Sequence, residues 1–155
     1  MCFFVVLSIF SLTVGIETSI GIPVVGLYNQ VSTGQTLNLF LSRNLGEFNL
    51  EMAGGIENFN SKNTDYLLED YSFMMGFSRK ARFMNIIARI GLTQIKRTLD
   101  ESREKGFGMA YDFGLGVPIK FEHVLVSPLV FYRGLTDLAS SAGSLYLGLR
   151  FGYEL

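Results

Sequence analysis

One segment of the chain alternates large apolar and small side chains without interruption. Between residues 107 and 121 every second position is large and apolar, and the positions between are mostly Gly, Ala or isolated charges. Successive side chains of a strand point to opposite faces, whereas a helix would spread both sets around its circumference. The segment is therefore predicted to be a strand with one wholly apolar face. Residues assigned to that face include Phe107, Met109, Tyr111, Phe113 and Leu115.

The end of the chain repeats this pattern. Its large apolar face includes Leu147, Leu149, Phe151 and Tyr153, and Ser, Gly, Arg and Glu occupy positions between them. Weaker copies lie at 36–42, 48–57, 71–78 and 84–93, and apolar β-branched segments without a clear inward face lie near 20–30 and 124–134. These eight segments, with no helical pattern between them, predict an all-β, antiparallel, up-and-down barrel.

The connections between the predicted strands differ in length. Short links fall at 44–47, at 80–82 and around residues 122–123, and long polar links at 58–70, 97–105 and 135–143. Only the first hairpin, at 31–34, is short where a long loop is expected. Short turns at one end and long loops at the other are typical of outer-membrane barrels, whose long loops are extracellular. We therefore expect the three long loops to contact any extracellular ligand or surface.

The alternation fits two kinds of barrel, which place the same residues on opposite sides. In a soluble lipocalin-like barrel, Phe113 and Leu149 would line a cavity for an apolar ligand; in a transmembrane barrel they would contact lipid. The small face is dominated by Gly, Ala and Ser, whereas a solvated exterior more usually carries Lys, Glu and Thr. A closed barrel also pairs every backbone amide, as hydrocarbon requires. The transmembrane barrel is favoured, and the soluble barrel is kept as the alternative.

Isolated charges on the small face are predicted to point into the lumen. Because isolated buried charges are costly, we expect these side chains to pair across the interior and to play a structural role. An eight-stranded barrel leaves little room for a conducting path. The predicted lumen-facing polar residues are Glu51, Arg89, Asp112, Lys120, Arg150 and Glu154.

Composition excludes several function classes. The chain carries 13 basic and 14 acidic side chains, which leaves no basic surface for nucleic acid. Its one Cys cannot form an intramolecular disulfide or a structural zinc site. A barrel enzyme that modifies lipid A would need a nucleophile with a His and an acid, but the one His, His123, falls in a predicted short turn. No catalytic, cofactor-binding or metal-binding residue is assigned, and a non-enzymatic role is expected.

The amino-terminal segment is apolar and uncharged from residue 2 to residue 14. It is shorter than the roughly 18 residues of a spanning helix and matches the hydrophobic region of a signal peptide. We therefore predict a signal peptide at 1–19 and a barrel domain at 20–155. A buried first strand is the alternative for this segment.

Prolines oppose the barrel interpretation, because a closed barrel has no free edge strand to hold them. All three, Pro23, Pro118 and Pro128, fall within predicted strands. We expect each to lie near the periplasmic end, at a bulge or at the start of a strand.

The carboxyl terminus carries a resemblance. The segment 146–155, YLGLRFGYEL, has a polar residue, Gly and then alternating hydrophobic residues. It is similar to the terminal signal that the barrel-assembly machinery reads, although the family usually ends on Phe and this chain ends on Leu155, with Tyr153 two residues earlier. Together with the eight segments, it makes residues 20–155 resemble the small outer-membrane barrels of Gram-negative bacteria, of the OmpX/OmpA type. The resemblance implies an outer-membrane location, with membrane lipid and the assembly machinery as partners, and no catalytic motif.

Overall fold

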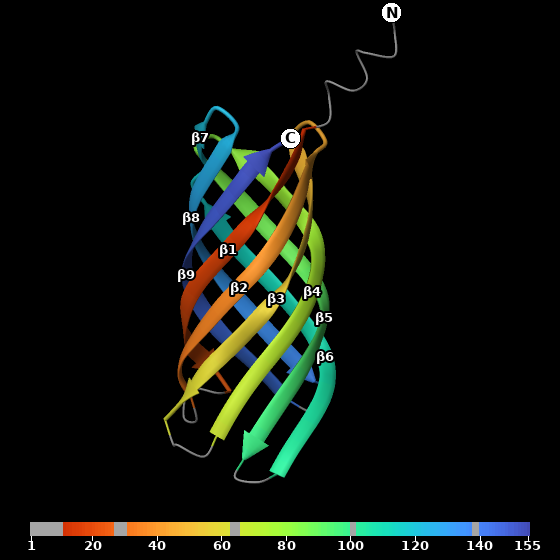
Figure 1. The fold of residues 1–155 in the computed structure, drawn as a ribbon, viewed down its shortest axis with the longest axis vertical. Coiled ribbons are helices and arrows are strands. Elements are labelled where there is room, and N and C mark those ends of the chain that lie inside the picture. Colours follow the sequence, from red (N-terminus) through yellow and green to blue (C-terminus); the bar gives the residue numbers. More distant parts are fainter. Residues whose placement is uncertain (1–10, 27–30, 63–65, 100–101, 138–139) are drawn as a thin grey trace, which may run out of the picture.

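The computed structural model describes residues 11–26, 31–62, 66–99, 102–137 and 140–155, and all its regular elements are antiparallel strands (Figure 1). Among these residues no helix is long and apolar enough to cross a membrane. The strands are β1 (Leu12–Val25), β2 (Val31–Asn44), β3 (Phe48–Ser61), β4 (Tyr66–Ala81), β5 (Met84–Leu99), β6 (Ser102–Gly116), β7 (Ile119–Phe121), β8 (Val124–Asp137) and β9 (Ser140–Glu154).

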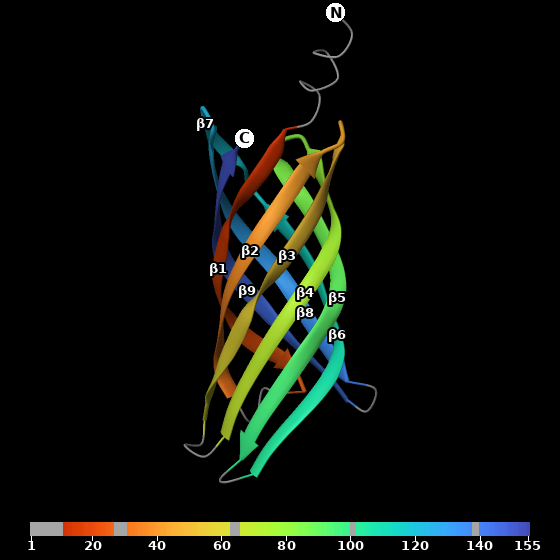
Figure 2. The same ribbon diagram turned by 45° about the vertical axis from the view of Figure 1, so that its right-hand side comes forward.

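Neighbouring strands pair in chain order, and β9 pairs with β1 to close the sheet (Figures 1 and 2). β6 and the short β7 both pair with β8 in one continuous register, Gly116 opposite Leu129 and Ile119 opposite Val126, so together they form a single interrupted wall strand. The wall therefore has eight strands, and the predicted closed antiparallel barrel is confirmed. The short turns, β7 and the last residues of β9 lie at one end, the turn end; the other end is called the far end.

The prolines are accommodated by interruptions of the ladder. Pro118 lies between β6 and β7, and Pro128 lies on β8, across from this gap. The backbone N–H groups that these two prolines lack are therefore both missing at one interruption of the ladder. The ladder keeps a bond there, because Val117 N–H donates to the Pro128 carbonyl at 3.0 Å. Pro23 adjoins an irregularity in the β1–β9 register. The expected position of Pro23 was wrong: it lies at the far end of β1, because that strand begins earlier than predicted.

Strand β1 begins at Leu12, eight residues before the predicted start of the barrel domain at residue 20. Residues 12–19 pair with 36–43 of β2 and, from residue 13, with β9. Val14 and Ile16 are exposed on the outside of β1, whereas Glu17 is fully buried on its inward side, so this strand also alternates with a period of two. The signal peptide expected at 1–19 stays a prediction, and residues 1–10 of it lie outside the described residues.

The three predicted long loops are also corrected, because strand covers most of 58–70, 97–105 and 135–143. β5 and β6, for example, stay paired as far as Leu99 opposite Ser102. Residues 63–65, 100–101 and 138–139 of these links lie outside the described residues.

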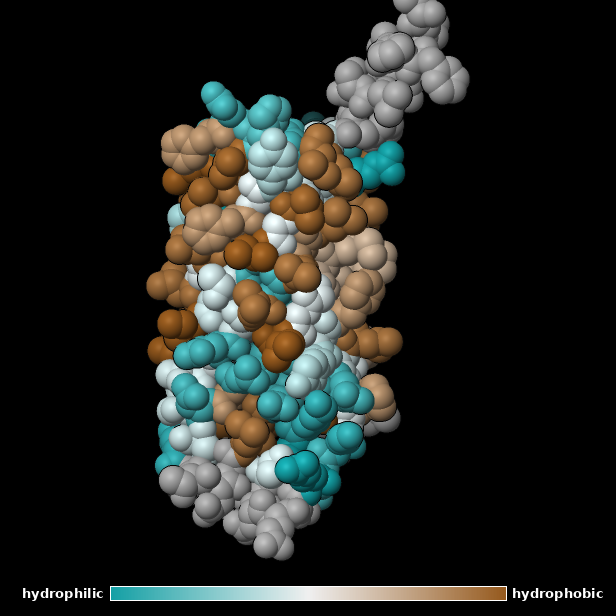
Figure 3. All heavy atoms as spheres, in the orientation of Figure 1, coloured by the Kyte–Doolittle hydropathy of each residue, from teal (hydrophilic) through white to brown (hydrophobic). Residues whose placement is uncertain are grey.

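Polarity inverts along the barrel, which explains why these segments look like loops. Near the turn end and in the middle, apolar side chains point outward and polar ones inward. Toward the far end the inside is apolar and the outward positions of β3, β5 and β6 are mostly polar, whereas β1 keeps Ile22 and Val24 exposed outside. Figure 3 shows hydrophobic side chains over the upper part of one face and hydrophilic ones gathered below them. The apolar residues buried inside the far end include Val31, Phe59, Leu68, Met74, Ile95, Ala110 and Leu135. Each large side chain buried there contributes about 1.5–3 kcal/mol relative to exposure, which holds these strands together.

Candidate functional site

A network of ion pairs crosses the barrel interior with Glu17 of β1 at its centre. The Glu17 carboxylate is fully buried and accepts hydrogen bonds from two guanidinium groups. Arg89 Nη2 donates to Glu17 Oε1 at 2.9 Å, and Arg150 Nη2 donates to Glu17 Oε2 at 2.8 Å. Asn38 Nδ2 also donates to Oε1, at 3.2 Å. Charge-assisted bonds of this kind offset the cost of taking the charges out of water.

The network extends to both sides of Glu17. Arg150 makes a two-point contact with Glu51 of β3, through bonds of 2.9 and 3.1 Å, and its guanidinium lies 4.5 Å from the centre of the Phe40 ring. Arg89 pairs with Asp112 at 2.8 Å, and Asp112 in turn accepts bonds of 2.7 and 2.9 Å from Arg133. Six charged side chains from β1, β3, β5, β6, β8 and β9 are thus tied into one structural unit.

Four of the six predicted lumen residues, Glu51, Arg89, Asp112 and Arg150, lie in this network. The other two do not reach it: Lys120 and Glu154 pair with each other at the turn end, with side chains 56% and 26% exposed. Lys120 lies on β7, after the Pro118 interruption, where the wall no longer encloses its side chain.

Several interior charges were missed by sequence reasoning. Glu17 fell within the predicted signal peptide, Asp70 within a predicted loop, and Arg133 within a segment without a clear inward face. Glu57 alternates in phase with Glu51 along β3, and that spacing is the signal that could have found it. Arg133 and Glu57 contact each other at 3.5 Å, one side chain from each of two distant strands.

Side chains leave little open space inside the barrel. A cavity of about 140 Å³ lies near the turn end and is lined in part by Ser42, Asn49, Ser78, Glu51 and Arg150. Beyond it come the ion pairs and then the apolar residues of the far end. A side-chain-filled lumen is what eight strands impose.

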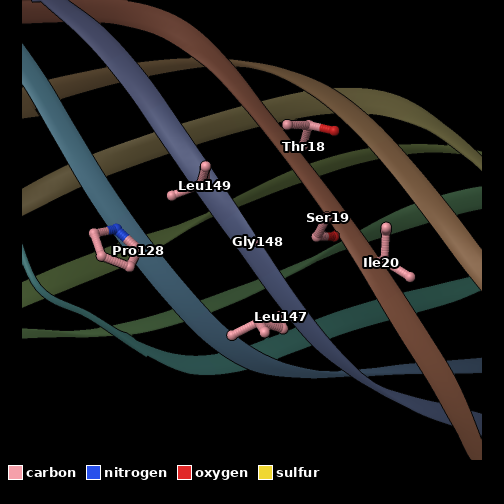
Figure 4. Close-up of a pocket in the computed structure, with 7 residues that line it drawn as sticks. All are labelled: Thr18, Ser19, Ile20, Pro128, Leu147, Gly148 and Leu149. Carbon is pink, nitrogen blue, oxygen red and sulfur yellow. The ribbon is translucent and has the colours of Figure 1, made fainter.

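The predicted lipid-facing side chains all point outward, with exposed fractions from 40% for Tyr111 and Phe151 to 77% for Phe107. These residues are Phe107, Met109, Tyr111, Phe113, Leu115, Leu147, Leu149, Phe151 and Tyr153. The outer wall also has an apolar groove of about 420 Å³, where Gly148 on β9 lies between Thr18 and Ile20 of β1 and Pro128 of β8 (Figure 4). Phe113 and Leu149 therefore do not line an internal cavity.

A basic surface lies outside the barrel toward the far end, on β5 and β6. Lys96 and Lys105 lie directly opposite each other in the register, and Arg103 lies two residues before Lys105 on β6, nearer the far end; Glu69 of β4 lies opposite Lys96 on its other side. Lys96 Nζ is 4.1 Å from the centre of the Tyr71 ring. Like charges that face each other across strands repel, and an anion bound between them would relieve that repulsion.

The residues that the structure describes offer no catalytic or metal-binding arrangement. His123 is exposed in the turn before β8, with its ring 5.8 Å from that of Tyr153. No group of three or more His, Cys, Asp or Glu side chains in the described part of the chain is placed to hold a metal ion.

Comparison with known proteins finds similarity in structure alone. No protein-family model and no curated protein sequence matches the chain. Among solved structures, the attachment invasion locus protein Ail of Yersinia pestis matches with a TM-score of 0.59 at 13% identity, over 93% of this chain and 97% of Ail. The amino-terminal β-barrel domain of Pseudomonas aeruginosa OprF matches with a TM-score of 0.59 at 13% identity, over 91% and 97%. Neisserial surface protein A matches with a TM-score of 0.58 at 12% identity, over 94% and 97%. The chain therefore shares the fold of small outer-membrane barrels, as its predicted resemblance implied.

Proposed function

We propose that this protein is a non-enzymatic barrel of the Gram-negative outer membrane, which anchors a polar, strand-built extension at the cell surface. The observation that carries the proposal is the inversion of polarity along the wall. Apolar side chains point outward over most of the barrel, as a lipid environment requires, and polar ones point outward on β3, β5 and β6 at the far end, as water requires. The far end would then be extracellular and the turn end periplasmic.

The filled interior supports an anchoring role over a transport role. Buried ion pairs and apolar side chains occupy the lumen in turn, so a solute would have to break several charge-assisted bonds to pass. The soluble-barrel alternative is disfavoured, because it would expose Phe113 and Leu149 to water at 60% and 43% of their surface. Modification of lipid A is disfavoured because His123 lies in a turn at the turn end, which would be the periplasmic end and not the end that meets the outer leaflet.

Two measurements on the expressed chain test this proposal. A folded barrel in detergent should migrate differently on a gel before and after boiling, and it should insert into lipid vesicles without releasing an entrapped small dye. A chain that stays folded and monomeric in plain buffer would contradict the membrane assignment. Rapid dye release would contradict the closed lumen.

We further propose that the surface role is exerted through the basic surface formed by Lys96, Arg103 and Lys105, which fits a sulfated or phosphorylated polyanion. The solved structures offer a parallel, because Ail has been crystallised in complex with the heparin analogue sucrose octasulfate. A cation cluster with three side chains on adjacent strands can contact several anionic groups at once.

Sucrose octasulfate itself is the probe for this surface. The barrel in detergent should bind it with an affinity that falls steeply with salt, because the interaction is electrostatic. The triple variant Lys96→Gln, Arg103→Gln, Lys105→Gln should lose binding, whereas Arg79→Gln and Lys80→Gln at the turn end should retain it. If the triple variant and the turn-end variants bound sucrose octasulfate equally well, the binding surface would not be the one on β5 and β6.

A further inference from the structure

Two buried carboxyl groups, Glu57 of β3 and Asp70 of β4, face each other inside the barrel without enough positive charge around them. They are direct partners in the β3–β4 register, and both side chains point inward, at 1% and 0% exposure. Neither Glu57 oxygen has a hydrogen-bond partner among the described residues, and Asp70 Oδ2 has none either. Thr93 Oγ1 of β5 donates to the other Asp70 oxygen.

The charge balance of the interior is incomplete at this pair. Three of the five buried carboxylates, Glu17, Glu51 and Asp112, are hydrogen-bonded by the three buried arginines. Arg133 contacts Glu57 at 3.5 Å, longer than its 2.7 Å bond to Asp112. Two negative charges would therefore remain unmatched among buried side chains if Glu57 and Asp70 were both ionised, at a cost that folded proteins avoid.

Among the described residues, Arg133 is the cation that contacts this pair; Arg97, also on the inward side of β5, lies nearer the far end and lines a pocket with Glu104. β8 contributes Arg133 and β6 contributes Asp112, a further negative charge. β5 contributes the Thr93 hydroxyl, and its Arg89 is bonded to Glu17 and Asp112. β1 contributes Glu17, β9 contributes Arg150, which is held by Glu17 and Glu51, and β2 contributes the uncharged Asn38.

We propose that Glu57 and Asp70 form a proton-binding site, in which one carboxylic acid O–H donates to the partner carboxylate. A protonated carboxyl group becomes a hydrogen-bond donor, which satisfies an oxygen that otherwise has no partner. Two carboxyl groups that face each other in a buried site cannot both ionise readily, so they retain a proton that comes from solvent when the barrel forms. A metal cation is disfavoured, because it would need several more oxygen ligands than these carboxyl groups and Thr93 provide.

Infrared spectroscopy of the full chain in lipid vesicles tests the site directly. At neutral pH the wild-type barrel should show the C=O stretch of a protonated carboxylic acid. Glu57→Gln and Asp70→Asn should each remove it, and either variant suffices if the other fails to fold. Glu51→Gln, which changes a carboxylate already bonded to Arg150, should keep the band.

Unfolding by urea gives a second readout. Because the proton is held in the folded state, the wild-type midpoint should fall as the pH is raised from neutral, and Glu57→Gln should flatten this dependence. Absence of the carboxylic acid band from wild type would overturn the proposal, as would a midpoint that rises with added metal salt in place of protons. Both results leave the anchoring role intact, since that role is tested by insertion and dye retention.

Discussion

At the scale of single residues, the interior is a set of charges that tolerate burial only because they are shared. Arg150 illustrates this, since it bonds Glu17 and Glu51 from opposite sides and stacks against the Phe40 ring. Breaking a buried pair by removing one partner leaves an uncompensated charge, which costs more than the pair itself contributes. An exposed pair has no such penalty.

Replacing Arg150 with Met should therefore lower the free energy of unfolding by about 3–5 kcal/mol, because Glu17 and Glu51 lose a shared partner. The matched control is Lys120→Met, which removes the solvent-exposed partner of Glu154 and should cost at most about 1 kcal/mol. Urea titration of both variants in lipid vesicles, followed by fluorescence of the tyrosines, measures the difference. Equal losses of unfolding free energy would mean that the buried ion pairs of Arg150 stabilise the barrel no more than the exposed Lys120–Glu154 pair does.

At the scale of elements, each long strand serves two environments in turn. Along β5, Leu92 points outward and Thr93 inward, whereas further on Gln94 lies outward and Ile95 is buried inside. The backbone ladder continues unbroken through this change, as far as Leu99 opposite Ser102. Strand geometry fixes whether a side chain points into or out of the barrel. Whether an outward side chain should be apolar depends on whether lipid or water surrounds the wall at that height.

The basic stretch of β5 and β6 should consequently resist trypsin in the folded barrel, although it contains cleavage sites at Lys96, Arg97, Arg103 and Lys105. Ile95→Asp places a charge inside the apolar far end and should open this hairpin to cleavage. Gln94→Asp, its outward neighbour, should leave the hairpin resistant. Mass spectrometry of the fragments locates the cuts, and rapid cleavage of wild type between residues 96 and 105 would contradict a paired hairpin.

At the scale of the whole molecule, the face drawn in Figure 3 is mostly hydrophobic in its upper part and more hydrophilic in its lower part. Exposed large hydrophobic residues occur on every wall strand, which a water-soluble exterior would not carry. This distribution, with a filled lumen, suits a protein whose activity lies at its far end and whose barrel serves to hold that end at a membrane surface.

Leu149→Arg should lower the free energy of unfolding in lipid vesicles by about 2–4 kcal/mol, because it places a charge on the apolar wall. Gln35→Arg, on the outward side of β2 in the polar region, should cost only about 0–1 kcal/mol. Both changes introduce the same side chain at an outward position, so the difference reports the position of the lipid. Equal effects would argue that neither residue contacts hydrocarbon.

The amino-acid sequence by itself determined the class of fold, because a period of two over segments such as 107–121 is compatible with strands alone and leaves one face wholly apolar. It also placed Glu51, Arg89, Asp112 and Arg150 on the opposite face, since a position in a strand sets its side. The outward orientation of Phe113 and Leu149 followed from the size and chemistry of the two faces.

Only the tertiary structure decided where each strand begins and ends, and which charges meet. Glu17 lies within the predicted signal peptide, and it becomes the centre of the network only because closure brings β1 against β9. The far-end strands were mistaken for loops, because the sequence does not reveal where lipid gives way to water and the favoured polarity of each face reverses. Lys120 shares the inward pattern but lies beyond the Pro118 break, where the wall no longer encloses it. Whether a side chain points into or out of the barrel is set locally, by its position in the strand. How deep it lies, and which side chains it contacts, depend on the closure of the barrel and on the surrounding lipid or water.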